Sequence, residues 1–255
     1  MTFRTEDLFP AHFLKCFNYA LHHTYTEYTL YGGRGSCKSS FISLMLLIIL
    51  AQNENVSAVC IRKHENTCRD SVYAQIRWAI DKLELNDVWK CNVSPLQMTN
   101  KLTGQKIFFR GCDDPVKLKS LKVEKGYVGF LWFEESVEFN AADMRSVKQT
   151  VMRGGDKFWV FDSFNPPVSR RSWKNADLLQ VKSNRYIHKS TFLDVPRSWL
   201  SDSFIYEAKH LSKTNERMFR NEYLAEPTGS GANVFENIET RKITDEEIAD
   251  FQWTY

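Results

Sequence analysis

Short apolar runs alternate with amphipathic segments along the first two thirds of the chain. Residues 56–61 form a short apolar run of strand length, and residues 127–133 form a continuous apolar run. Residues 67–83 and 141–152 instead carry apolar side chains at helical spacing. A further strand-like run covers residues 157–162. Strands alternating with helices predict an α/β fold with a mostly parallel central sheet, flanked by helices and joined by right-handed crossovers.

Smaller elements are predicted around this sheet. Residues 88–111 read as a β-hairpin, because two short β-prone runs flank a turn that contains glycine. Residues 201–224 have a helical pattern with many charges. We therefore expect a core domain at residues 1–200, which begins with a lead-in segment, and a lid or linker region at residues 201–255.

Composition adds limits to this picture. With 255 residues, 43% of them hydrophobic, the chain can form one large domain with a substantial core. The net charge of +3 is mild but uneven: residues 169–220 hold 11 Lys/Arg and 5 Asp/Glu, and residues 221–255 hold 2 and 8. The six cysteines form no C-x-x-C pair, which favours reduced thiols. The longest apolar run, residues 41–51, is too short to span a bilayer, and we expect no membrane association.

Residues 28–51, YTLYGGRGSCKSSFISLMLLIILA, are the most informative stretch. A β-prone run enters a glycine-rich turn and an apolar helix follows, which is the context that a phosphate-binding P-loop requires. Successive N–H groups of the turn and the helix N-terminus favour an anion. Lys38 would reach the β- and γ-phosphates of ATP, and the Ser39 hydroxyl would ligate Mg²⁺. The predicted ATP-binding residues are Gly32, Gly33, Arg34, Gly35, Ser36, Cys37, Lys38, Ser39 and Ser40.

One residue departs from the pattern G-x-x-x-x-G-K-[ST]. Cys37 stands where the last glycine is expected. Because the cysteine side chain is small, we expect a modified site that still works. A glycine-rich turn before a core helix, without a ligand, is the alternative interpretation.

Two adjacent acids end the apolar run at residues 127–133. Carboxylates at the end of a buried strand are costly unless they meet a metal ion or a cation. In P-loop NTPases the first acid of such a pair supports Mg²⁺, and the second orients and deprotonates the attacking water. We therefore predict Glu134 as a metal-site residue beside Ser39, and Glu135 as a catalytic residue. Simple strand-end charges are the alternative.

A third polar group follows the strand-like run at residues 157–162. Ser163 and Asn165 precede two prolines that stiffen the chain. Polar residues at the end of a strand beside the P-loop and the acidic strand would lie where a γ-phosphate can be sensed. The S-F-N-P motif is a weak signal alone. It is stronger because it follows the glycine-rich turn and the acid pair in this order along the chain.

Taken together, these motifs resemble the ATPase half of the large terminase subunit of tailed double-stranded DNA phages. The matching residues are GGRGSCKSS at 32–40, LWFEE at 131–135, SFNP at 163–166 and NEYLAEPTG at 221–229. The resemblance implies a P-loop NTPase fold of the ASCE or RecA-like type. It also implies a motor that hydrolyses ATP to drive double-stranded DNA into a procapsid.

The resemblance also implies residue roles. Lys38 and Ser39 would bind phosphate and Mg²⁺, Glu134 would be the Walker B acid, and Glu135 the catalytic carboxylate. Ser163 and Asn165 would form the coupling motif. Arg34 would sense or stabilise the γ-phosphate like an arginine finger, although an arginine supplied in trans is an alternative. Glu134 replaces a more usual Asp, which leaves the mode of metal contact open.

The family implies partners as well: double-stranded DNA, the portal protein of the procapsid, the small terminase subunit, and further copies in a ring on the capsid. We expect a monomer in isolation and a location in the bacterial host cytoplasm. Members also carry an RNase H-like nuclease domain. This chain ends about where its first strand would begin, so we expect an excised ATPase domain without DNA cutting, in which acidic residues 245–250 belong to a linker helix.

Two other functions stay open at this point. One is another P-loop nucleic-acid motor, such as a helicase or an AAA-type remodeller. The other is a nucleotide-gated binding module that hydrolyses little ATP. The arginine within the P-loop and the S-F-N-P sequence favour the packaging motor over the first of these.

Overall fold

The computed structural model of this chain describes residues 4–113, 118, 121–229 and 244. An eight-stranded sheet lies at its centre in the order β3-β4-β5-β2-β6-β7-β1-β8. The six neighbouring strands β5, β2, β6, β7, β1 and β8 are parallel, and β3 and β4 form an antiparallel edge. The mostly parallel sheet predicted from the sequence is thus confirmed. The strands are β1 (Glu27–Gly32), β2 (Val56–Arg62), β3 (Trp89–Val93), β4 (Leu96–Asn100), β5 (Lys106–Gly111), β6 (Tyr127–Glu134), β7 (Trp159–Phe164) and β8 (Arg185–Ser190).

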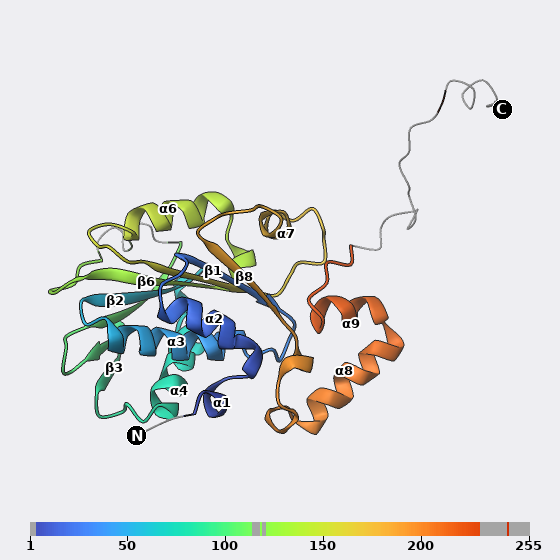
Figure 1. Cartoon of the computed structure of the whole chain (residues 1–255), viewed down its shortest axis with the longest axis horizontal. Helices are drawn as coiled ribbons and strands as arrows, with labels where there is room; N and C mark the ends of the chain where they lie inside the picture. The colour runs from blue at the N-terminus through green and yellow to red at the C-terminus, as the bar shows by residue number, and fades with distance from the viewer. Residues whose placement is uncertain (1–3, 114–117, 119–120, 230–243, 245–255) are drawn as a thin grey trace.

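Helices cover both faces of the sheet (Figure 1). One face carries α1 to α4, the other carries α6 and α7, and the pair α8 and α9 lies at one end of the molecule. The helices are α1 (Thr5–Leu8), α2 (Leu14–Leu21), α3 (Lys38–Gln52), α4 (Ala74–Lys82), α6 (Ala141–Val151), α7 (Trp173–Leu178), α8 (Asp202–Thr214) and α9 (Glu216–Glu222).

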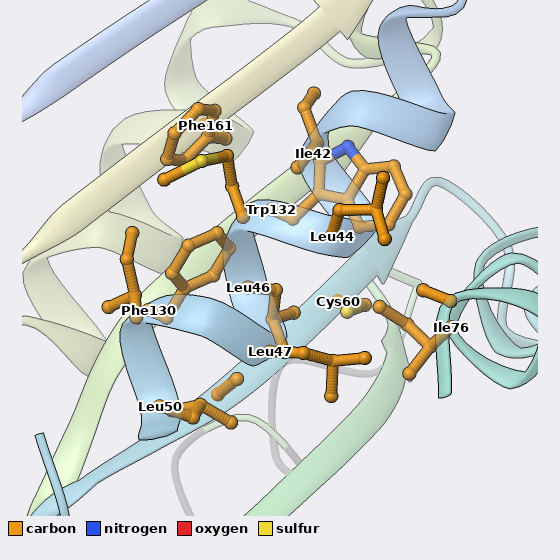
Figure 2. Packing of buried hydrophobic residues seen from close by; sticks show 14 of the residues in the cluster. Ile42, Leu44, Leu46, Leu47, Leu50, Cys60, Ile76, Phe130, Trp132 and Phe161 are labelled. Carbon is orange, nitrogen blue, oxygen red and sulfur yellow. The ribbon is translucent and has the colours of Figure 1, made fainter. Parts of the chain in front are cut away.

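Alternation along the strands divides the core between the two faces, because successive strand residues point to opposite sides. On β6, Phe130 and Trp132 pack in the cluster of α3, which Figure 2 shows from close by. Leu131 and Phe133 pack in the other cluster, against α6. All four side chains are 0% exposed, so β6 is buried on both faces, as its continuous apolar run predicts.

Parallel pairing brings the ends of three strands to one edge of the sheet. Ser163 of β7 is in register with Leu30 of β1 on one side and with Glu134 of β6 on the other. The turn after β1, the acids after β6 and the polar residues after β7 therefore converge, as expected for a ligand site at the carboxyl ends of parallel strands.

Several local predictions need correction. The hairpin at 88–111 is confirmed by the pairing of β4 with β5, but β3 and the edge strand β8 were not predicted from the sequence. In β8, charged residues interrupt the apolar pattern. The helical pattern at 201–224 forms two helices that meet at Asn215 rather than one. Ser163 lies inside β7 rather than after it. The linker predicted at 245–250 and the chain end at 251–255 lie outside the described residues.

No helix within the part of the chain that the structure describes has the length and apolar character needed to cross a membrane.

Candidate functional site

The turn between β1 and α3 forms a small hollow at the carboxyl edge of the sheet. Residues 33–40 and Asn165 line its volume of about 180 Å³. Gly35 has a φ of 71°, which favours glycine. At Gly33, a Cβ atom would lie 1.9 Å from the carbonyl oxygen of Tyr223, so the loop can pack against the end of α9 only with glycine there. Of the nine predicted ATP-binding residues, Gly32 ends β1, and the other eight form the turn and the first residues of α3 and line the hollow.

Cys37 shows why glycine is expected at its position. Its φ of 62° and ψ of 18° place it in the left-handed region, immediately before α3 begins. A side chain in this conformation costs roughly 1 kcal/mol or more. The loop nevertheless closes, and the first helical turn forms with Phe41 N donating to Cys37 O at 2.9 Å. The turn is therefore strained at Cys37 and still forms.

Lys38 points back over the loop. Its ammonium donates to the carbonyl oxygens of Gly32 and Gly33 at 3.1 and 3.2 Å, to Ser36 Oγ at 3.0 Å and to Asn165 Oδ1 at 3.0 Å. The residue is only 8% exposed. Burial lowers the pKa of Lys38 to about 8, and the nearby carboxylates of Glu134 and Glu135 act in the opposite direction. Its neighbours are neutral oxygen atoms, so an anion entering the hollow would supply the missing counter-charge.

Glu134 ends β6 and receives hydrogen bonds on both carboxylate oxygens. Ser39 Oγ donates to Oε1 at 2.6 Å, and Ser163 Oγ donates to Oε2. Burial raises the pKa of Glu134, and the two serine hydrogen bonds act to lower it. The contact between Ser39 and Glu134 unites the two residues predicted as a metal site.

This pair of side chains fits a magnesium site. Hydroxyl and carboxylate oxygens are the hard ligands that Mg²⁺ takes, and Mg²⁺ completes its shell with water and substrate phosphates rather than with a full set of protein ligands. Among the described residues, no group of three or more His, Cys, Asp or Glu side chains is arranged to hold a metal ion without such additional ligands.

Glu135 has a different environment from its neighbour. Its φ of 53° and ψ of 52° are left-handed, and it caps the short 3₁₀ helix Ser136–Glu138. Its carboxylate makes no hydrogen bond or ion pair with the residues that the structure describes. Strained backbone is concentrated at functional sites, and the unengaged carboxylate follows directly on the end of β6.

Arg34 lines the hollow, and its side chain is engaged by α9. Its Nε donates to Glu222 Oε2 at 3.0 Å, and its backbone N–H donates to the carbonyl oxygen of Glu222 at 2.8 Å. Phe204 of α8 lies over Gly35, where a Cβ atom would meet its ring at 2.5 Å. The two C-terminal helices therefore pack directly on the loop.

Sequence reasoning missed three residues at this site: Glu222, which holds Arg34, Asn221, which donates to Pro166 O at 3.1 Å, and Trp132, which donates to Ser163. All three lie within motifs that were singled out, NEYLAEPTG and LWFEE, but nothing in the linear pattern shows what any of them contacts.

Comparisons with known proteins find relatives in sequence and in fold. The family model described as phage terminase large subunit matches residues 25–226. The large terminase subunit of Bacillus phage SPP1 is 38% identical over 257 residues, which cover 97% of this chain and 60% of that protein. The PBSX phage terminase large subunit of Bacillus subtilis is 26% identical, covering 80% and 49% of the two chains. The chain thus spans about half to three fifths of the length of these relatives.

Solved structures show the same fold. The large terminase of the thermophilic bacteriophage D6E superposes with a TM-score of 0.68 at 12% identity, covering 86% of this chain and 53% of that one. It has also been solved with ADP and with ATP-gamma-S, at TM-scores of 0.65 and 0.64. The ATPase domain of the Thermus phage P74-26 large terminase has a TM-score of 0.57 at 14% identity, covering 81% and 91%.

Proposed function

The chain belongs to the phage terminase large subunit family, a family of DNA-packaging motors, and on that premise we propose that it is an ATP-hydrolysing motor domain. One observation carries the proposal. Lys38 and Asn165, which follows β7, line one hollow and are hydrogen-bonded to each other, and Ser39 of the same turn donates to Glu134 at the end of β6. The nucleotide complexes of the similarly folded D6E protein support ATP as the ligand.

Each residue then has a defined role. Lys38 binds the β- and γ-phosphates, and the loop N–H groups hold the rest of the triphosphate. Ser39 and Glu134 would hold Mg²⁺, which would offset phosphate charge when bound. Glu135 orients a water molecule and takes its proton as the water attacks the γ-phosphorus, while the bond from the γ-phosphorus to the β,γ-bridging oxygen breaks and ADP leaves. Asn165 responds to the γ-phosphate through its bond with Lys38, and Ser163 links that response to Glu134.

Arg34 must move to act on phosphate, because its side chain is engaged with Glu222 in this structure. We propose that nucleotide draws Arg34 from Glu222 to the γ-phosphate. An arginine from a neighbouring copy is the alternative source of this charge. Hydrolysis measured over a range of protein concentrations distinguishes the two, since only the second requires assembly.

The wider role follows from the family. We propose that ATP hydrolysis drives double-stranded DNA into a procapsid in the host cytoplasm, with the portal protein, the small terminase subunit and further copies in a ring as partners. Residues 1–200 would form the core and residues 201–255 the lid and linker. The basic surface of segment 169–220 would contact DNA phosphates, and its affinity should fall steeply with salt.

The variant Glu135→Gln tests the catalytic assignment. It keeps the shape of the side chain and removes its basicity, so we expect ATP hydrolysis to fall about 10²- to 10⁴-fold while ATP binding persists. Phosphate release measures the first and calorimetric titration the second. As a control, Glu138→Gln changes an acid three residues away that pairs with Arg62, and hydrolysis should stay near the wild-type rate. A Glu135→Gln protein with wild-type turnover would contradict the proposal.

A further inference from the structure

A hydrogen bond reaches the predicted metal site from within the core. The indole Nε1–H of Trp132 donates to Ser163 Oγ at 2.8 Å, and Ser163 Oγ in turn donates to Glu134 Oε2. The other carboxylate oxygen of Glu134 accepts the hydroxyl of Ser39 at 2.6 Å. Nothing in the sequence resemblance assigns a role to Trp132.

The direction of this chain is set by chemistry. An indole N–H can donate but cannot accept, so the Ser163 oxygen must be the acceptor in its contact with Trp132. The Ser163 hydroxyl has one proton, and it donates this proton to Glu134. The alternative acceptor, the carbonyl oxygen of Phe133, is farther away, at 3.4 Å. Trp132 therefore determines which way the Ser163 hydroxyl points.

The sheet makes this arrangement rigid. Trp132 and Glu134 are two residues apart on β6 and share the α3 face, and Ser163 is the register partner of Glu134 on β7. Trp132 is 0% exposed, and its indole is enclosed in the buried cluster that includes Ile42 and Leu44 of α3 (Figure 2). A ring enclosed in this way has little freedom to release its hydrogen bond.

We propose that Trp132 is a positioning residue for Mg²⁺, which rests on the proposed function above. By orienting Ser163, it holds the Glu134 carboxylate where that group also takes the Ser39 proton. The Ser39 oxygen then keeps its lone pairs free for the metal ion. Residues that orient metal ligands in this way typically contribute 10- to 100-fold to metal affinity or activity.

A matched pair of tryptophans allows a sharp test. Trp132→Phe removes the N–H and retains an aromatic ring. Trp159→Phe makes the same change at an indole that is 1% exposed and donates at 2.8 Å, but to the carbonyl of Ala20 in α2. Both variants lose similar packing and one buried hydrogen bond, so their difference reports the link to Ser163.

The first measurement is calorimetric binding of ATP-gamma-S at a series of Mg²⁺ concentrations. We expect the Mg²⁺ concentration at half-saturation to rise about tenfold in Trp132→Phe. It should stay within about twofold of wild type in Trp159→Phe, and nucleotide binding without Mg²⁺ should be equal in both. Adding Ser163→Ala to Trp132→Phe should cause no further rise beyond that of Ser163→Ala alone, because the two act through one hydrogen-bond chain.

The second measurement does not depend on nucleotide. In spectra of ¹⁵N-labelled indoles, the resonance absent from Trp132→Phe identifies Trp132. That resonance should shift in Ser163→Ala, while the one absent from Trp159→Phe should not. The measurement is still possible if Trp132→Phe does not fold. Trp159→Phe then identifies the resonance of Trp159, and the spectrum of Ser163→Ala shows whether any other indole resonance shifts.

The outcomes are distinct. If Trp132→Phe and Trp159→Phe have the same Mg²⁺ dependence, or if no indole other than Trp159 responds to Ser163→Ala, the inference is overturned and the proposed function stands. If wild-type protein binds no nucleotide with Mg²⁺, the proposed function is overturned and the inference with it.

Discussion

Two buried lysines on opposite faces of the sheet show what separates a ligand site from a structural contact. Lys38, on the α3 face, is 8% exposed and donates only to neutral oxygens. Lys174, in α7, is 1% exposed and forms an ion pair with Asp162 at 2.6 Å. The rings of Phe164 and Trp173 lie 4.7 and 5.0 Å from the same ammonium.

The difference lies in where the counter-charge comes from. A charge buried without a partner is unfavourable, which is why burial lowers the pKa of Lys38 to about 8. Lys174 has its carboxylate already, and Thr29 donates a further hydrogen bond to the same Asp162 oxygen at 3.3 Å. We infer that Lys38 is poised for an anionic ligand, whereas Lys174 fastens α7 to β7.

The largest effect expected from this comparison is on stability. Lys174→Met would leave the Asp162 carboxylate buried and unpaired, and the free energy of unfolding should fall by about 3–5 kcal/mol. Lys38→Met removes a charge that has no carboxylate partner, so a change of no more than about 1 kcal/mol is expected. Urea denaturation measures both.

Adding Asp162→Leu to Lys174→Met should restore much of the lost stability, because no buried charge is then left. Equal destabilisation by Lys38→Met and Lys174→Met would contradict the distinction between a lysine poised for a ligand and a lysine in a structural ion pair.

The second prediction concerns ligand binding. ATP at 100 times its dissociation constant should stabilise the wild-type protein by about 2.7 kcal/mol. Lys38→Met should lose most of this stabilisation, because the lysine is the one buried cation at the phosphate site among the described residues. Thermal unfolding with and without ATP and Mg²⁺ provides the measurement. An undiminished ATP effect in Lys38→Met would refute the P-loop assignment.

A third buried basic side chain extends the comparison to pH. His188 of β8 contacts His12, with 3.0 Å between Nε2 and Nδ1. Burial, together with the His12 charge, lowers the pKa of His188 to about 4, and Asp194 acts in the opposite direction. The unfolded chain therefore binds a proton between about pH 6.5 and 4 that the folded chain does not.

Stability from this histidine is complete above about pH 6.5 and decreases as the pH falls toward 4. Between pH 7.5 and pH 5 we expect a loss of about 2 kcal/mol from this group. His188→Phe should flatten the dependence of the unfolding free energy on pH over this interval. A slope as steep as that of the wild type would show that other groups are responsible.

The smallest expected effect is at Cys37. Cys37→Gly relieves the left-handed backbone strain, but it also increases the entropy of the unfolded chain. We expect a net gain of about 0.5 kcal/mol in unfolding free energy, measured by urea denaturation. Cys16→Ala, at a fully buried helical cysteine, should instead destabilise the protein. A destabilised Cys37→Gly protein would show that the loop is not strained.

Much of the site could be predicted from the chain because its signals are local. Glycines and Lys38 within nine residues, an apolar run that stops at Glu134, and polar residues at the end of the next core strand each have a meaning at short range. The family resemblance added the roles of Arg34, Ser163 and Asn165. Their convergence on one edge then followed from the rule that ligand sites form at the carboxyl ends of parallel strands.

Contacts between distant segments could not be predicted in the same way. The engagement of Arg34 by Glu222 spans 188 residues, and the bond from Trp132 to Ser163 spans 31. Asp162 and Ser163 are neighbours in sequence, yet Asp162 meets Lys174 while Ser163 meets Glu134. Nothing in the order of residues states which strands pair or which helix covers which face.

The sequence by itself therefore determined the type of fold, the glycine-rich turn before α3 and the acids at the end of β6, because these depend on residue type and short-range spacing. The tertiary structure alone decided that Arg34 pairs with Glu222, that Lys38 donates to neutral oxygens while Lys174 pairs with a carboxylate, and that Trp132 donates to Ser163. Each of these depends on strand register and on which helix packs on which face, and only the folded chain brings those atoms together.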